Sequence, residues 1–159
     1  MILDTQRYND LNKGLFDSIA KAKLIDCSVL FSYTFSFEAH DLLPLLSHPA
    51  DKNKCRIYWE QPIESFSLAG LGKILELSFD NSSSLDLVNK KISNYFDNAT
   101  HITNQPFAGP RFLGGHSFNS SVKTDNTWSN FPRTCYILPE CLATLSDDGC
   151  WLTISKMIN

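Results

Sequence analysis

The longest alternation of apolar and polar positions in the chain runs from Ser28 to Phe37. Successive side chains of a β-strand point to opposite faces of the sheet, so this pattern predicts one long strand. One face carries large apolar side chains and belongs in the core, whereas the other is small and mostly polar. We expect the polar face to meet solvent rather than to line a cleft. The apolar face consists of Val29, Phe31, Tyr33, Phe35 and Phe37, and the opposite face of Ser28, Leu30, Ser32, Thr34 and Ser36.

Two other segments repeat their apolar residues at steps of three and four, the periodicity of an amphipathic helix. The first contains Gly14, which costs about 1 kcal/mol relative to alanine, so this helix depends on packing. The second follows a capping-box pattern from Ser83 to Asp86 and stops near Asn98. The apolar faces consist of Tyr8, Leu11, Leu15, Ile19 and Ala22 in the first helix, and of Leu85, Val88, Ile92, Tyr95 and Phe96 in the second.

Short strands between turns make up most of the remaining chain. Three of them, separated by Pro62 and by Gly70-Leu71-Gly72, suggest an antiparallel meander, and Asp147-Asp148-Gly149 is a hairpin signal between the last two. Loops are expected over 40–49, with one helical turn, and over 98–110 and 120–130. This order predicts an α+β fold, mainly an antiparallel sheet layered with helices, in one module over 1–159. The predicted short strands are Arg56–Glu60, Ser65–Gly70, Ile74–Asp80, Arg111–Asn119, Arg133–Leu138 and Cys150–Ile158.

Composition narrows the class of protein. Hydrophobic residues make up 43% of the chain and charged residues 19%, which is typical of a folded globular protein. The formal net charge is −3, and the Lys and Arg residues are scattered, so we expect no nucleic-acid partner. Apolar stretches fall far short of the ~20 residues that span a bilayer, and the N-terminus lacks the features of a signal peptide. We therefore expect a soluble cytoplasmic protein without a membrane partner.

The chain has five cysteines, an odd number, and no CxxC pair. This predicts buried free thiols in a reducing compartment rather than a disulfide framework or a zinc site.

Candidate chemistry is sparse. His40, His48, His101 and His116 form no metal-binding spacing, and no GxSxG elbow is present. Gly70-Leu71-Gly72-Lys73 lacks the full phosphate-loop pattern and precedes a strand, so a tight turn is the better interpretation. Gly114-Gly115 within a strand indicates a bulge or a close backbone approach, and Asp147-Asp148 is explained by its turn. The residues by themselves predict no catalytic, cofactor-binding or metal-binding side chain.

Four segments, in order, resemble the front of isochorismate synthases over about Ile57 to Thr153. Leu113 departs slightly from that pattern, because an aromatic residue is common there. The segments are Ile57-Tyr58-Trp59-Glu60-Gln61-Pro62; Phe66-Ser67-Leu68-Ala69-Gly70-Leu71-Gly72; Gly109-Pro110-Arg111-Phe112-Leu113-Gly114-Gly115-His116-Ser117-Phe118-Asn119; and Trp128, Phe131-Pro132 and Ile137-Leu138-Pro139-Glu140.

The resemblance implies the N-terminal part of the chorismate-utilising enzyme fold. It also implies Mg²⁺-dependent conversion of chorismate to isochorismate, for menaquinone or siderophore synthesis. In that family a Lys base, a Glu acid and Mg²⁺-binding Glu residues lie in a C-terminal chorismate-binding segment, which would begin after Asn159. We therefore expect a module of a larger enzyme that packs against its own catalytic half and is inactive alone. Two alternatives stay open: an anthranilate, aminodeoxychorismate or salicylate synthase segment, and a stand-alone non-enzymatic ligand-binding or interaction module.

Overall fold

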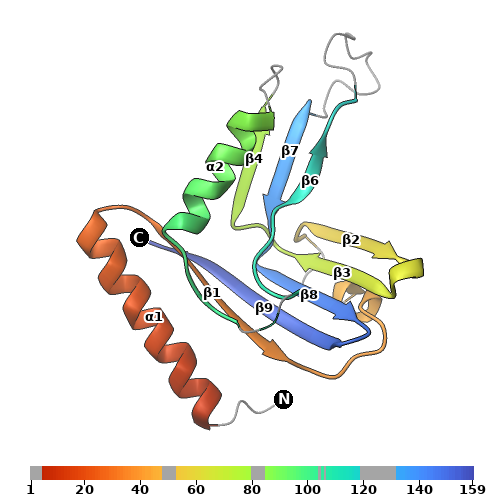
Figure 1. The fold of residues 1–159 in the computed structure, drawn as a ribbon, viewed down its shortest axis with the longest axis horizontal. Helices are drawn as coiled ribbons and strands as arrows, with labels where there is room; N and C mark the ends of the chain where they lie inside the picture. Colours follow the sequence, from red (N-terminus) through yellow and green to blue (C-terminus); the bar gives the residue numbers. More distant parts are fainter. Residues whose placement is uncertain (1–4, 48–52, 80–84, 104, 106, 119–131) are drawn as a thin grey trace.

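The computed structural model describes residues 5–47, 53–79, 85–103, 105, 107–118 and 132–159. It contains two sheets and two long helices, which confirms the α+β class (Figure 1). The helices are α1 (Thr5–Ile25) and α2 (Leu85–Asp97), with short 3₁₀ helices η1 (Leu43–Ser47) and η3 (Pro62–Glu64). The strands are β1 (Val29–Ser36), β2 (Arg56–Gln61), β3 (Phe66–Leu71), β4 (Leu75–Phe79), β5 (Thr100–Ile102), β6 (Leu113–His116), β7 (Thr134–Leu138), β8 (Cys141–Ser146) and β9 (Gly149–Ile158).

The larger sheet has six strands in the order β2-β3-β8-β9-β1-β5. All neighbours run antiparallel except β1 and β5, which are parallel. The predicted loop over 98–110 therefore includes a short strand that the sequence pattern did not reveal. Strands β4, β7 and β6 form a second, three-stranded sheet, and α2 lies along β4 (Figure 1).

The expected antiparallel meander is only partly right. Strands β2 and β3 pair as predicted, but β3 continues to β8, whereas β4 leaves for the second sheet and pairs with β7. Strand β8 was not predicted, and it takes the place next to β9 that we expected for the strand ending at Leu138. The two-residue turn at Asp147-Asp148 joins β8 to β9, with Ser146 paired to Gly149. The hairpin prediction was right about the turn and wrong about one of its strands.

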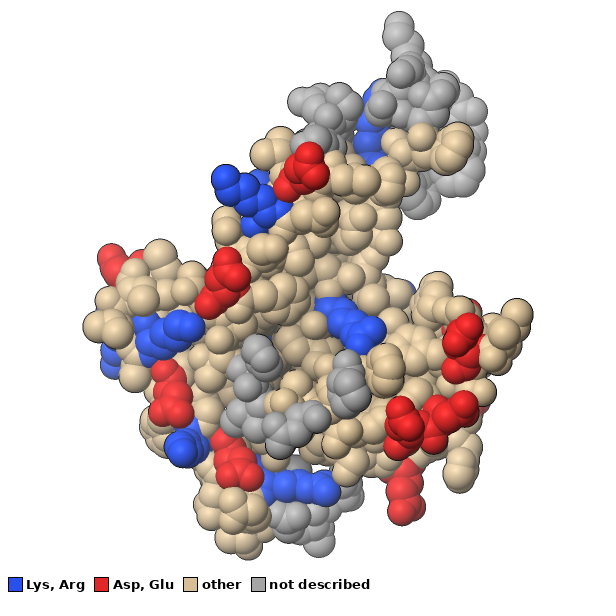
Figure 2. Space-filling view, in the orientation of Figure 1, with Lys and Arg blue, Asp and Glu red and all other residues tan. Residues whose placement is uncertain are grey.

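The surface carries its charges in small groups. On the side of the molecule shown in Figure 2, basic side chains alternate with acidic ones over α1 and form no continuous stripe. Acidic side chains gather on the opposite side of that view, near the ends of β2 and β3. Within the described ranges, no helix has both the length and the hydropathy needed to cross a membrane.

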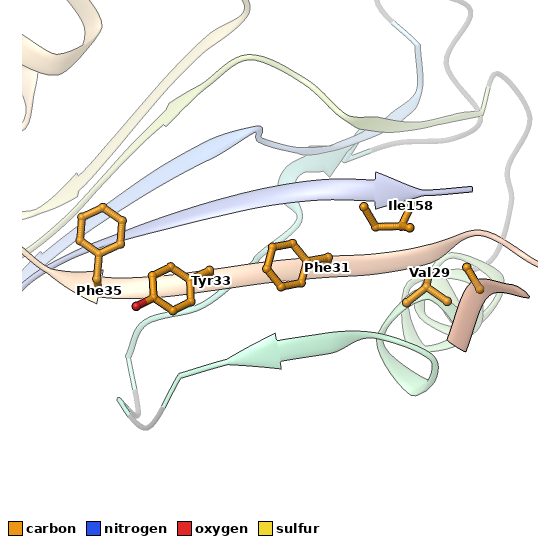
Figure 3. Packing of buried hydrophobic residues seen from close by; sticks show 6 residues of the cluster. Val29, Phe31, Tyr33, Phe35 and Ile158 are labelled. Atoms are coloured by element: carbon orange, nitrogen blue, oxygen red, sulfur yellow. The ribbon is translucent and has the colours of Figure 1, made fainter. Parts of the chain in front are cut away.

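One face of the six-stranded sheet is covered by α1. Val29, Phe31, Tyr33 and Phe35 line this face of β1 one after another, with Ile158 of β9 beside them (Figure 3). Helix α1 packs against them through its predicted apolar positions Leu11, Leu15, Ile19 and Ala22, but Tyr8 is 56% exposed and lies outside the cluster. Gly14 is buried, which explains why this helix contains a residue that weakens isolated helices. A second cluster on the same face joins η1 to β3, β8 and β9.

Much of the opposite face of β1 is buried as well, which corrects our expectation that this face meets solvent, although Ser36 at the end of β1 is exposed as expected. Leu30 and Ser32 are each 1% exposed. The register places this face of β1 next to equivalent positions of β9, with Ser32 beside Ser155 and Thr34 beside Thr153. The Thr34 and Thr153 hydroxyl oxygens lie 2.9 Å apart in a hydrogen bond. We call this side of the sheet the hydroxyl face: Ser32, Thr34, Thr144, Thr153 and Ser155.

Several boundaries differ from the predicted ones. The strand expected over 111–119 shortens to Leu113–His116, and the helical turn expected around 41–43 is the 3₁₀ helix Leu43–Ser47. The capping residues before α2, the end of the 40–49 loop with His48, and the 120–130 excursion lie outside the described residues. The five cysteines are free thiols, but only Cys150 is buried, so the prediction of uniformly buried thiols was wrong.

Candidate functional site: an aromatic groove

An aromatic groove crosses one end of the hydroxyl face. It consists of two adjoining hollows of about 550 and 570 Å³, both lined by Trp59 of β2 and Phe66 at the start of β3. The register explains the position, because Trp59 pairs with Leu68 and Leu68 pairs with Thr144, so all three side chains share one face. The rings of Trp59 and Phe66 meet edge to face, with centroids 5.9 Å apart. The groove is lined by Ile57, Trp59, Phe66, Leu68, Phe107, Arg111 and Phe112.

Arg111 is the cationic residue of this groove. Its guanidinium lies over the Phe66 ring, 5.9 Å from the ring centroid, and its Nη2 donates a hydrogen bond of 2.7 Å to the Phe107 carbonyl oxygen. Among the described residues, no acidic side chain forms an ion pair with it. A planar guanidinium held against an aromatic ring keeps its remaining N–H groups in a fixed fork, which is suited to a carboxylate.

The segment that carries Arg111 is attached to the sheet on both sides. The buried Gly109 N–H donates to the Thr153 Oγ1 at 3.1 Å, so the hydroxyl face holds the start of the segment. Phe112 contacts α2, since its ring lies 6.1 Å from that of Tyr95 and 6.0 Å from that of Phe96. These contacts set the position of Arg111 from two independent elements.

One end of the groove is acidic. Glu64 of η3 and the turn residues Asp147 and Asp148 line the hollow that also contains Phe107. They belong to the side of the molecule where Figure 2 shows acidic side chains gathered. Arg111 thus lines one hollow of the groove and the carboxylates line the other, and Trp59 and Phe66 line both.

The two glycine motifs are structural, as their sequence context indicated. A Cβ on Gly114 would overlap the Cys135 carbonyl oxygen and lie 2.8 Å from the Tyr136 Cα, which is the predicted close backbone approach. Gly72 has φ +72° and its amide bonds to the Cys55 carbonyl oxygen, so it makes the tight turn after β3. No helix begins there, and β4 follows instead. The phosphate-loop interpretation is thereby excluded.

The histidines do not combine into a site within the described part of the chain. His40 is exposed and lines a further hollow with Glu60 and Ser65, which shares Phe66 and Asp147 with the acidic end of the groove, whereas His116 is exposed at the end of β6. No group of three or more His, Cys, Asp and Glu residues is arranged to hold a metal ion among the residues that the structure describes. The resemblance implies Mg²⁺-binding Glu residues after Asn159, outside these residues.

The shifted pKa values of two cysteines and one lysine have clear physical causes. Burial raises the pKa of the Cys150 thiol to about 11 and also raises that of Cys135, which makes both thiols weaker nucleophiles at neutral pH. A hydrogen bond from Lys73 to Glu76 raises the pKa of the lysine and keeps it protonated. A general base needs the opposite shift in a lysine. The groove can bind a partner through apolar contact and charge.

The sequence patterns alone did not identify this groove, although a signal for it was present. Ile57, Trp59, Phe66 and Leu68 come from the first two segments that resemble isochorismate synthases, and Arg111 and Phe112 come from the third. Segments about fifty residues apart in the chain therefore meet at one surface. Their convergence required the pairing of β2 with β3 and the path of the segment before β6, neither of which periodicity determines.

Comparison with known proteins agrees with this convergence. The family model described as chorismate binding enzyme matches residues 17–159. Isochorismate synthase MenF of Bacillus subtilis (strain 168) is 25% identical over 167 residues, an alignment that covers 100% of this chain and 35% of that relative. The chain thus spans about a third of the length of the curated relative it matches. Because the family match includes nearly all of the fold described above, the chain belongs to the chorismate binding enzyme family.

Proposed function

We propose that this chain is the N-terminal segment of an isochorismate synthase, an isomerase that converts chorismate to isochorismate in the cytoplasm. The observation that carries the proposal is the alignment with the Bacillus subtilis isochorismate synthase, which extends along all of this chain and covers 35% of the relative. The order of the resembling segments from Ile57 to Glu140 supports the same product.

In this proposal the chain supplies the framework rather than the reacting groups. The alignment covers only 35% of the relative, which supports placing the base, the acid and the magnesium ligands in another part of the enzyme. The six-stranded sheet and the aromatic groove would then position that part. The isolated chain is expected to leave chorismate unchanged.

The first experiment is to sequence the coding DNA downstream of Asn159 and to assay the encoded protein. We expect the frame to continue into a segment with a base lysine and several glutamates, and the longer protein to form isochorismate in a Mg²⁺-dependent reaction. The 159-residue chain, assayed beside it with chorismate and Mg²⁺, should form none.

Three results would contradict the proposal in different ways. Isochorismate formation by the isolated chain would refute its inactivity. If the longer protein forms anthranilate, aminodeoxychorismate or salicylate, the family assignment stands but the proposed reaction is wrong. A stop codon after Asn159 with no neighbouring gene for a catalytic segment would favour a stand-alone binding module.

A further inference from the structure

We infer that the aromatic groove is the surface on which the catalytic part of the enzyme docks. This inference rests on the proposed function, and it names the interface: Trp59, Phe66, Phe107 and Arg111, with the acidic end formed by Glu64, Asp147 and Asp148. The occupant is the polypeptide that corresponds to the part of the Bacillus subtilis relative outside the alignment, which is the larger share of that protein.

The exposed aromatic surface provides the first reason. Trp59 and Phe107 are each 48% exposed, although both lie in a groove with further apolar side chains beside them. Large aromatic side chains gain free energy when they leave water, and contiguous exposed patches of them mark interaction sites. Leu24 on α1, which is 85% exposed, lines neither hollow. The groove therefore offers exposed aromatic surface to a partner.

The charge pattern gives the chemistry of the docking segment. Arg111 lies between aromatic walls without an acidic partner in the described part of the chain, so burial would require a carboxylate from the other side. The exposed carboxylates of Glu64, Asp147 and Asp148 would favour a cation at the adjoining end. A segment with an Asp or Glu flanked by apolar residues, and a Lys or Arg beyond them, satisfies both ends. Such fixed opposite charges determine register and orientation more than affinity.

The origin of the groove residues in the chain supports a protein partner of this enzyme family. Trp59, Phe66 and Arg111 come from three of the segments that resemble isochorismate synthases, whereas Phe107, Glu64, Asp147 and Asp148 lie outside those segments. The second of these segments also contacts the fourth beside the groove. A Cβ on Gly70 would lie 3.0 Å from Pro139 Cγ, and one on Gly72 would overlap Glu140, so β3 fits closely against the residues after β7. The family resemblance thus includes the aromatic wall and the cation of this surface, as expected of an interface between two parts of one enzyme.

The test measures association in trans. The polypeptide encoded downstream of Asn159 is produced as a separate chain, and its binding to the 159-residue chain is measured by isothermal titration calorimetry. Trp59→Ala should weaken binding by about tenfold or more, because a half-exposed tryptophan at the centre of an interface is a typical hot spot. Arg111→Glu should weaken it at least as much, and Arg111→Lys less, since lysine keeps the charge and loses the fork. Leu24→Ala, an exposed apolar residue on α1, is the matched control and should change binding less than about twofold.

Each variant is first compared with the original chain by circular dichroism and urea unfolding. The Trp59→Ala change keeps the test decisive if Arg111→Glu disturbs the 107–111 hydrogen bond and the fold with it. Wild-type affinity of a folded Trp59→Ala variant, or equal weakening by Leu24→Ala, would overturn the inference. A second copy of the chain bound in the groove would also overturn the inference. It would be detected as a dimer in analytical ultracentrifugation that becomes a monomer in the Trp59→Ala variant.

Activity of the mixture separates this inference from the proposed function. If mixtures with folded groove variants form isochorismate as well as the mixture with the original chain, the docking surface is refuted. The proposed function is unaffected by that result. Groove-dependent association in a mixture that forms a different product, or none, supports the docking surface and refutes the isochorismate synthase assignment.

Discussion

The neighbouring glycines of β6 should respond in opposite ways to the same substitution. A methyl group on Gly114 would overlap the Cys135 carbonyl oxygen and lie 2.8 Å from the Tyr136 Cα. Both obstacles are backbone atoms of β7, so no side-chain rotation relieves them. Accommodation requires β6 and β7 to separate, which weakens the ladder between Leu113 and Ile137 and between the neighbouring pairs.

The expected cost of Gly114→Ala is about 3 kcal/mol, the upper end of the usual range for overpacking. This is a large fraction of a typical domain stability of about 5–15 kcal/mol. Gly115 is the matched control, because a Cβ there meets nothing within 4 Å and its φ is not in the left-handed region. Gly115→Ala should stabilise the chain by about 0.5 kcal/mol through the lost freedom of the unfolded state.

Urea unfolding followed by circular dichroism measures both changes. With a slope of about 2 kcal/mol/M, Gly114→Ala should lower the midpoint by about 1.5 M and Gly115→Ala should raise it by about 0.2 M. Equal midpoints for the two variants would refute the close approach of β6 to β7. A destabilised Gly115→Ala variant with an unaffected Gly114→Ala variant would show that the register of this strand is shifted by one residue.

Three further changes test the buried polar groups, each by urea unfolding. Thr153→Val removes the acceptor of the buried Gly109 N–H and should cost about 1–3 kcal/mol, and a midpoint unchanged from the original chain would contradict this bond. Thr144→Val, at a buried hydroxyl without a hydrogen-bond partner in the described structure, should be neutral or stabilising, and a loss above about 1 kcal/mol would reveal a missing partner. Burial raises the pKa of Cys150 to about 11, so the folded state holds this proton more tightly than the unfolded state. The contribution of the Cys150 proton to the free energy of unfolding should therefore be complete below about pH 9 and decline toward pH 11. In the Cys150→Ala variant, the free energy of unfolding should decline less over this range.

The periodicity of apolar residues predicted the helices and strands well where an element carries most of its large apolar residues on one face. Strand β1 and helices α1 and α2 lie where the alternation and the three-and-four spacing placed them. Strand β1 and helix α1 share a clear apolar core, whereas α2 buries Val88, and Leu85 of its predicted apolar face is 45% exposed. The hairpin turn was predictable too, because Asp and Gly are residues that favour turns. Gly149 of the Asp147-Asp148-Gly149 segment has φ +138°. Which strand enters that turn was not predictable, because Cys141–Ser146 mixes small, polar and apolar residues without strict alternation.

Strand order could not be predicted from these patterns. Strands β3 and β4 are separated by only three residues, a spacing that favours a hairpin, yet they belong to different sheets. The tight turn at Gly72, closed by its bond to the Cys55 carbonyl oxygen, redirects the chain before β4 can pair with β3. The sequence contains the glycine, but the partner that completes the turn comes from seventeen positions earlier and is evident only in the fold. The same limit applies to the groove, which depends on this strand order.

The hydroxyl face connects the least predictable part of the fold with its proposed role. Small polar residues on a strand normally indicate solvent, and Ser32, Thr34 and Ser36 led to that expectation. In the structure, Ser32 is buried and Thr34 bonds to Thr153, whose hydroxyl in turn accepts from the segment leading to Arg111. Hydroxyls can hold a polar backbone segment flat against a sheet, which leucine or valine cannot do. The Thr34 and Thr153 hydroxyls of this face thus hold the segment that crosses it and carries Arg111, the residue proposed to contact the catalytic part of the enzyme.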